Sequence, residues 1–404
     1  MADKCPMHGH DMPFDEEYWH APFDRYAQFH EQGPVHRVCL PDGIPVWLVT
    51  GYTEVYDALR DQRLARHRKY ANDDYTNNLP PEGLPQSRLV MEDPPDHTKS
   101  RRLVNFGFVP RRMRLLKPKI HELVAGLLDD IEAKGAGGGV VDLMDTFCAP
   151  LPITVICDLV GMPEEERVHV REWGELVFSG QLVNPQGIGA AMARALVERR
   201  TNPQDDLLTT WAEVTDDDGN LLPPEDLSHM ALIMFAAGYD STMGMLSCSA
   251  LALMERPDYA ARLANADEDE LHKLMEEMFR MYSPTQRGFR RFAREDLELG
   301  GQKISAGDTV FLSIGAADRD PAKFPNANDL DFERTENKHL VFGRGPHACP
   351  GAELARIENG IALQELFRRF PNMKLAAPSD DLKWRESTLI RLPTSLPVTI
   401  SQGE

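Results

Sequence analysis

One ten-residue segment constrains this chain more than any other, and it reads Phe342-Gly343-Arg344-Gly345-Pro346-His347-Ala348-Cys349-Pro350-Gly351. Its glycines allow the backbone to wrap closely around the sulfur of Cys349. The amide groups of such a tight loop, and the N-terminus of a helix predicted over 352–358, favour a thiolate. A metal-bound thiolate is therefore one interpretation, and a buried structural cysteine in a glycine-rich turn is the other.

The segment resembles the heme-binding loop of the cytochrome P450 family, Phe-Gly-x-Gly-x-His-x-Cys-x-Gly, at all six fixed positions. The resemblance extends from about Glu16 to the C-terminus. It implies one heme b whose iron is bound by the Cys349 thiolate, with Phe342, Gly343 and Gly351 next to the porphyrin. It also implies the family's mainly helical (α+β) fold, in which a large helical body is joined to a small β-rich portion.

Hydrophobic periodicity also predicts a mostly helical chain. Helical spacing is clear at 119–133, 164–177 and 190–200, and short β-type runs at 35–40 and 46–50 predict a hairpin. We expect a single domain over 1–404 with a disordered tail over 1–15. The helical body is expected at about 97–283 and 320–372. The β-rich portion is expected at 35–68, 285–315 and 385–402, with a closing hairpin over 389–400.

Composition excludes several classes of protein. The formal net charge is −20, so affinity for nucleic acid is not expected. The first ten residues lack the basic and apolar regions of a signal peptide, and the strongest apolar run, 231–238, is too short to span a bilayer. The six cysteines are scattered, as in proteins of a reducing compartment. We therefore expect a cytoplasmic monomer that does not bind membranes.

A second motif, in an apolar helix predicted to begin near Leu227, reads Ala237-Gly238-Tyr239-Asp240-Ser241-Thr242. Taken alone, its polar residues would be a mere helix irregularity. Beside the heme loop, the motif resembles the family's oxygen-activation segment, Ala-Gly-x-acid-Thr-Thr. This implies that Ala237 and Gly238 leave room for O2 and that Asp240, Ser241 and Thr242 form the catalytic group. Ser241 replaces the usual threonine and lacks the methyl group that restricts the rotamer.

Basic and imidazole side chains are expected to bind the heme propionates. His97 and Arg101 are four residues apart on one predicted helix, and the resemblance adds Arg291 and His347. Two buried carboxylates need cationic or hydrogen-bonding partners. Each of these residues, taken alone, would instead be an exposed polar side chain.

A structural network is predicted from Glu277 and Arg280, whose spacing of three places both side chains on one face of a helix. An isolated pair of this kind is usually a surface salt bridge of little worth. The resemblance implies instead a buried network that includes Arg334 and supports the heme loop.

The segment 99–119 contains eight Lys or Arg residues and no acid. It is either a solvated basic surface or a docking face for an acidic electron donor such as a ferredoxin. The resemblance implies ferredoxin and ferredoxin reductase as partners, which pass electrons from NAD(P)H. Charge reversal at Arg111 and Arg112 is then expected to slow reduction.

The resemblance implies a monooxygenase that hydroxylates or epoxidises a small organic molecule with O2 as co-substrate. Family analogy places pocket walls at 70–89, 176–188, 233–237, 285–289 and 388–390. Their mixed polarity suits a bulky, partly oxygenated substrate, and the resemblance is closest to actinobacterial enzymes that tailor macrolides and other polyketides. Three alternatives remain: a heme-thiolate protein that only binds or senses ligands, a peroxide-using enzyme, and a protein without heme whose loop matches by accident.

Overall fold

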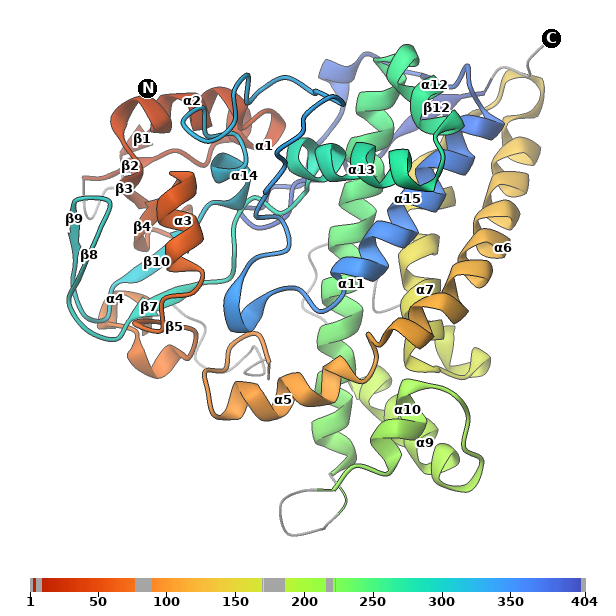
Figure 1. The fold of residues 1–404 in the computed structure, drawn as a ribbon, viewed down its shortest axis with the longest axis horizontal. Coiled ribbons are helices and arrows are strands. Elements are labelled where there is room, and N and C mark those ends of the chain that lie inside the picture. The colour runs from red at the N-terminus through yellow and green to blue at the C-terminus, as the bar shows by residue number, and fades with distance from the viewer. Residues whose placement is uncertain are drawn as a thin grey trace.

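The structure is a computed structural model of the chain, and it describes residues 3–4, 9–76, 89–168, 170, 186–215, 221 and 223–400. Most strands gather on one side of the molecule together with several short helices, most of the longer helices lie on the other side, and the long helix α11 (Pro224–Met254) runs through the middle (Figure 1). This arrangement confirms the predicted mainly helical fold with a small β portion.

The largest described sheet has the strand order β1-β2-β3-β4-β10-β7-β5. Its centre is the predicted hairpin, in which β3 (Val35–Cys39) pairs antiparallel with β4 (Pro45–Val49) across a turn where Gly43 has a φ of +81°. Next to β4 lies the parallel strand β10 (Thr309–Leu312), followed by the antiparallel β7 (Arg291–Ala293) and then β5 (Leu64–Ala65). The sheet therefore carries Arg291 into the interior at the first residue of β7.

The remaining strands form smaller pairings. A hairpin joins β8 (Leu297–Leu299) to β9 (Gln302–Ile304). A separate sheet has β12 (Pro397–Thr399) between β6 (Val140–Asp142) and β11 (Lys374–Leu375). The predicted closing hairpin over 389–400 is therefore wrong, because the partners of β12 come from distant parts of the chain that a local pattern does not reveal.

The described part of the N-terminus, residues 3–4 and 9–15, differs from the prediction of a disordered tail over 1–15, of which residues 1–2 and 5–8 lie outside the described residues. Strand β1 (Asp3–Lys4) pairs with β2 (Asp11–Met12), which joins β3. Phe14 is buried, and the Asp15 carboxylate accepts a hydrogen bond from the Tyr18 amide at 2.9 Å and so caps the first helix. An apolar anchor and a helix cap therefore fix the backbone before residue 15.

Helices make up most of the rest. The short helices are α1 (Glu16–His20), α2 (Phe23–Gln32), α3 (Tyr52–Ala58), α4 (Asp73–Thr76), α10 (Leu207–Ala212) and α14 (Ile314–Ala317). The longer helices are α5 (Asp96–Asn105), α6 (Pro110–Gly135), α7 (Pro150–Val160), α9 (Gln186–Thr201), α12 (Pro257–Asn265), α13 (Glu268–Tyr282) and α15 (Ala352–Arg369). Most of the helix predicted over 164–177 lies outside the described residues.

Helix α11 is the centre of the main hydrophobic core. It starts with Pro224 at its first position, where the missing N–H costs no hydrogen bond. Its residues pack against α7, α9 and α15, and Phe235 and Leu246 are fully buried. Protein therefore encloses α11 on several sides. We expect a ligand to lie against the few positions of α11 that are accessible.

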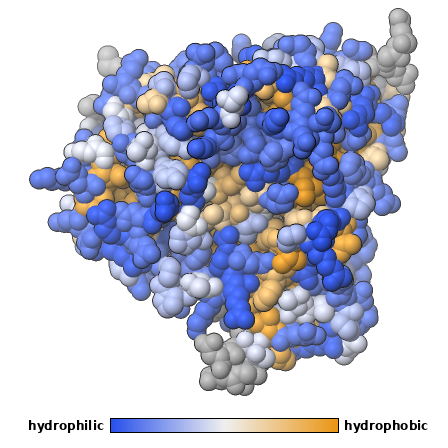
Figure 2. Space-filling model, in the orientation of Figure 1, coloured by the Kyte–Doolittle hydropathy of each residue, from blue (hydrophilic) through white to orange (hydrophobic). Residues whose placement is uncertain are grey.

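The surface agrees with the strongly acidic composition. On the face shown in Figure 2, hydrophilic residues cover most of the surface, and hydrophobic residues appear mainly over the helical part. Within the described residues, no helix combines the length and the apolar character needed to cross a bilayer.

Candidate functional site

The loop before α15 wraps around Cys349. Gly343 and Gly345 have φ angles of +62° and +73°, a region that favours glycine. At Gly345, an added Cβ would also lie 3.2 Å from the carbonyl oxygen of Leu59. The Cys349 amide donates to the carbonyl oxygen of Phe342 at 2.8 Å, and α15 begins directly beyond the loop. The glycines therefore permit the tight loop that the sequence predicts.

Cys349 has a different environment from the other cysteines in the described part of the chain. Its side chain is exposed, whereas the rest are buried, namely Cys39, Cys148, Cys157 and Cys248. Desolvation of the sulfur within the loop raises the pKa of the Cys349 thiol, against the opposite effects of the Gly351 amide, Arg101 and Arg356. A metal ion bound to the sulfur would act in the opposite direction and hold it as a thiolate.

A cluster of basic groups lies next to this loop. The rings of His97 and His347 are 4.0 Å apart. Burial lowers the pKa of Arg291 to about 10 and, with Arg66 and His97 nearby, the pKa of His347 to about 2. Nε2 of His97 and two guanidinium nitrogens of Arg66 are buried without a hydrogen-bond partner in the described residues. Asp93 is an acid whose charge acts on this cluster, but its carboxylate accepts from the backbone amides of Arg66 and His67. These side-chain nitrogens of His97 and Arg66 therefore still lack acceptors within the described residues.

Arg101 lies next to this cluster, and its charge contributes to the lowered pKa of His97 and of His347. Its role at the heme propionates stays a prediction. Its Nη1 donates to the carbonyl oxygen of Ala348 at 2.6 Å, and its Nε donates to Asn105 at 2.9 Å. Helix α5 thus carries Arg101 to the residue that precedes Cys349. In this position Arg101 holds the cysteine loop in place.

The motif on α11 divides between two sides of the helix. Ala237 is exposed, and the Ser241 hydroxyl, one turn later, donates to the Ala237 carbonyl oxygen at 2.6 Å. Gly238 faces α7 instead, because an added Cβ there would lie 3.5 Å from Ile156. Thr242 is buried in the core. The structure therefore groups Ala237 with Ser241 and separates Gly238 and Thr242 from them.

Asp240 forms an ion pair that the sequence analysis missed. Arg385 donates to its two carboxylate oxygens at 2.8 and 3.4 Å, and each side chain is 18% exposed. Arg385 lies 145 residues further along the chain, in an irregular segment. No local pattern identifies it, since its partner is set by the packing of this segment against α11.

The predicted structural network is present as a buried ion pair with further donors. Arg280 donates to both carboxylate oxygens of Glu277, at 2.7 and 2.8 Å, and the two side chains are 0% and 2% exposed. Nε of Arg334 donates to the same carboxylate at 3.2 Å, as does the side-chain amide of Asn337 at 3.0 Å. Asn337 lies only five residues before Phe342, so this network reaches the start of the cysteine loop.

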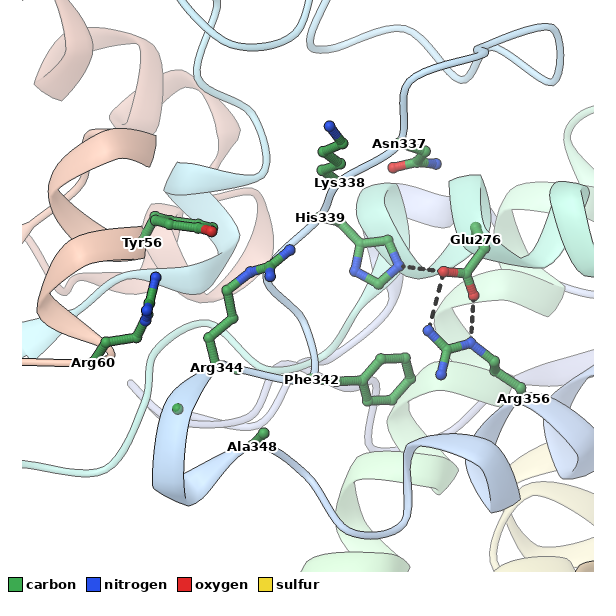
Figure 3. A pocket seen from close by; sticks show the side chains of 12 residues that line it. Tyr56, Arg60, Glu276, Asn337, Lys338, His339, Phe342, Arg344, Ala348 and Arg356 are labelled. Atoms are coloured by element: carbon green, nitrogen blue, oxygen red, sulfur yellow. Dashed lines mark hydrogen bonds and ion pairs between the residues drawn. The ribbon is translucent and has the colours of Figure 1, made fainter. Parts of the chain in front are cut away.

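A pocket of about 510 Å3 opens beside the cysteine loop (Figure 3). In it, Glu276 accepts hydrogen bonds from His339 at 3.2 Å and from Arg356 at 2.6 Å. Burial raises the pKa of Glu276, but these two partners outweigh it and bring the pKa to about 2. Arg356 also lies 4.5 Å over the Phe342 ring. The single acid of the pocket is thus neutralised.

The other cations around this pocket have no acidic partner in the described part of the chain. Arg60, Lys338 and Arg344 lie at its rim, and the Arg344 guanidinium stacks 4.7 Å from the Tyr56 ring (Figure 3). These three residues, which we call the rim cations, give the pocket a positive charge.

The basic segment 99–119, by contrast, has several side chains that pair with other parts of the chain. Arg111 pairs with Asp205 at 2.7 Å, and Lys117 pairs with Glu268 at 2.6 Å. Arg112 donates to the Asp206 carbonyl oxygen and to Thr210, both next to α10. Arg112 is thus partly held by the segment before α10 and by α10 itself, whereas the Arg111 side chain is 72% exposed. Docking of an electron donor at Arg111 and Arg112 stays a prediction.

Two of the expected pocket walls meet in the structure. Thr285 and Ile390 form an isolated β-bridge, and Arg287 donates to the Thr388 hydroxyl at 2.9 Å. The expected walls at 70–89 and 176–188 lie largely outside the described residues. The segments 285–289 and 388–390 are thus close together, as the family analogy predicts.

The comparisons with known proteins decide the family. A family model described as cytochrome P450 matches residues 191–396. The vitamin D(3) 25-hydroxylase of Pseudonocardia autotrophica is 36% identical over 97% of this chain and 96% of its own length. The chain belongs to the cytochrome P450 family. It is a cytochrome P450 monooxygenase.

Other similar proteins are also bacterial cytochromes P450, and one of them is named for a polyketide synthase. The cytochrome P450 monooxygenase PikC of Streptomyces venezuelae is 36% identical over 95% of this chain and 92% of its own. Among solved structures, the Bacillus subtilis bacillaene polyketide synthase cytochrome P450 PksS superposes with a TM-score of 0.85. It is 32% identical and covers 96% of this chain and 99% of its own. The chain is thus a full-length match to bacterial cytochromes P450.

The residues present fit the heme that the cytochrome P450 family uses. An exposed cysteine in a glycine loop suits an iron ligand, and the unpartnered nitrogens of His97 and Arg66 suit the two propionates of a heme. Arg66 was missed by the sequence analysis. One sequence signal for Arg66 was available. Arg66 begins a basic run, Arg66-His67-Arg68-Lys69, that directly follows a β-type pair of residues.

Proposed function

We propose that this cytochrome P450 inserts one oxygen atom from O2 into a C–H bond or an alkene of a bulky, partly oxygenated natural product, such as a macrolide or another polyketide. The observation that carries the proposal is the accessible Cys349 in its glycine loop, next to a cation cluster whose buried nitrogens on His97 and Arg66 lack hydrogen-bond acceptors in the described residues. The substrate class is supported by the similarity to PksS, whose name assigns it to a bacillaene polyketide synthase.

The protein's own groups have separate tasks in this reaction. When bound, the heme supplies the oxidising chemistry, and its thiolate ligand favours cleavage of the O–O bond. Cys349 would bind the iron, and Arg66, His97, Arg291 and His347 would hold the propionates. The orphaned hydrogen-bond donors of this cluster would then be satisfied.

Proton delivery is assigned to Asp240 and Ser241. The Ser241 hydroxyl lies on the accessible face of α11, so it can hold a proton at the place where O2 would meet the helix. Asp240 is partly exposed and can take protons from water, but Arg385 holds its carboxylate. Arg385 is therefore a positioning residue, and Asp240 has to leave or share this ion pair in order to pass a proton on.

Electrons are expected to come from NAD(P)H through a ferredoxin reductase and a ferredoxin. The rim cations Arg60, Lys338 and Arg344 are a better docking site for an acidic protein than 99–119, because no described acid pairs with them. They surround the pocket beside Phe342, which is close to Cys349 in the chain. We place the ferredoxin contact at this pocket.

Turnover with isotope-labelled oxygen tests the proposal. The holoenzyme, given ferredoxin, its reductase, NADPH and a panel of polyketides that shift the heme spin state, is expected to yield products with one labelled atom from 18O2. Product formed only with hydrogen peroxide would identify a peroxide-using enzyme instead. Ligand-induced spectral shifts without any oxygenated product would support a binding or sensing protein.

A further inference from the structure

The segment from Pro284 to Arg291 runs along one edge of the site. At one end, Pro284 packs against α11, where a Cβ added to Gly244 would lie 2.6 Å from the Pro284 side chain. Gly244 is one helical turn beyond Asp240. At the other end, Arg291 belongs to the cation cluster near the cysteine loop. Residues 285–290 therefore connect the oxygen helix with the cation cluster.

Arg287 lies in the middle of this segment and is held firmly. Its Nε and Nη2 donate to the Thr388 hydroxyl at 3.1 and 2.9 Å, and its Nη1 donates to the Gly288 carbonyl oxygen at 3.1 Å. The guanidinium carbon lies 3.9 Å from the centre of the Phe311 ring. A guanidinium has five N–H groups, so these contacts leave two of them unused.

The charge of Arg287 has no counterpart nearby. In the described part of the chain, Arg287 forms no ion pair with a carboxylate. Asp42 is the carboxylate whose charge acts on Arg287, but Asp42 forms its ion pair with Arg290, at 3.4 Å. Burial, reinforced by Arg290, lowers the pKa of Arg287 to about 9, so the side chain is still charged at neutral pH. A crowded cation with spare donors and no anion is costly unless a ligand supplies the anion.

The side chain is nevertheless partly accessible. Phe311, Thr388 and the backbone of Gly288 fix it in one orientation, which removes much of the entropy that a flexible arginine would lose on binding. The Thr388 hydroxyl accepts from Arg287, so its own proton is available for a second hydrogen bond. The pair can therefore present two guanidinium N–H groups and one hydroxyl to a ligand.

We propose that Arg287, assisted by Thr388, binds an anionic oxygen group of the substrate, a carboxylate or an ionised enol. This inference rests on the proposed function, because it assumes that the substrate lies beside 285–290 during turnover. It adds that the natural product is an acid whose charged end is fixed at Arg287, so that a distant part of the molecule is presented for oxidation.

Matched ligand pairs test the proposal in the holoenzyme. Tetradecanoic, 4-phenylbutanoic and 2-naphthoic acids are each compared with the corresponding primary amide by isothermal titration calorimetry. The Arg287→Gln variant is expected to bind at least one of the acids about tenfold or more weakly than the wild type. Its affinity for the matching amide is expected to change less than about twofold, and Arg287→Lys is expected to recover part of the lost acid affinity.

Arg290→Gln is the matched control, since Arg290 lies over the same Phe311 ring but already has Asp42 as a partner. This variant is expected to keep the wild-type preference between acid and amide. Equal losses for acid and amide in Arg287→Gln would show that Arg287 only ties two segments together, and would overturn the proposal. A wild type that binds none of the acids would overturn it as well. Normal heme-thiolate spectra in the same samples would separate this failure from a failure of the proposed function.

Discussion

The substitution Glu277→Gln tests whether the buried network supports the cysteine loop. Glutamine keeps the shape of the side chain but removes the negative charge that faces Arg280 at 2.7 Å. Arg280 is fully buried and cannot turn to water, and Arg334 loses the same partner. Removing one partner of a buried pair leaves an uncompensated charge, which costs about 3–5 kcal/mol.

The expected change in melting temperature follows from the size of the protein. With an unfolding entropy of about 2.1 cal/mol/K per residue, a chain of 404 residues loses roughly 1.2 °C of melting temperature for each kcal/mol of lost stability. The variant is therefore expected to melt about 4–6 °C below the wild type. It is also expected to lose heme faster, because Asn337 bonds to Glu277 just before the loop.

Glu268→Gln is the control on the same helix. Glu268 pairs with Lys117 at 2.6 Å, but its side chain is 84% exposed. Differential scanning calorimetry is expected to show no measurable shift for this variant. If Glu277→Gln also melts within about 1 °C of the wild type, the network does not hold the fold and the reasoning is refuted.

Three further predictions concern single residues. Burial raises the pKa of Glu358 from 4.5 to about 8, so between these pH values the folded protein keeps a proton on Glu358 that the unfolded chain loses, and the stability of the fold falls as the pH rises. In urea titrations, Glu358→Gln should remove this fall in stability. An unchanged pH profile would contradict the prediction. Asp240→Asn should lower kcat about 100-fold with little change in KM, whereas a loss confined to KM would argue against proton delivery. In stopped-flow assays, Arg60→Glu should slow the reduction of the holoenzyme by ferredoxin and weaken the salt dependence of this rate, whereas Arg111→Glu should leave both unchanged. Slower reduction in Arg111→Glu than in Arg60→Glu would place the docking site at 99–119 instead.

Sequence patterns were sufficient where the information is local. The hairpin around Gly43, the helix around Ser241 and the loop around Cys349 each depend on neighbouring residues, so periodicity and turn chemistry predicted them. The pairing of β12 with β6 is different, because strands that lie far apart in sequence meet only through the packing of the whole chain. For the same reason the closing hairpin was predicted wrongly.

The site follows the same division. Cys349 and Glu277 belong to short motifs with fixed spacing, and both were predicted by number. Arg66 and Arg385 were missed, since each acts on a residue that is distant in sequence, His347 and Asp240 respectively. The partners of Arg112 were also missed, because Asp206 and Thr210 come from a later part of the chain than its basic and apolar sequence neighbours.

The most direct test of the central claim is the spectrum of the reduced, carbon monoxide-bound protein. The wild type is expected to show the red-shifted Soret band of a heme-thiolate protein, and Cys349→Ser is expected to lose it. Cys248→Ala, which changes a buried cysteine instead, is expected to keep the band. A purified, heme-loaded wild type without this band, or a Cys349→Ser variant that retains it, would contradict the assignment of Cys349 as the iron ligand.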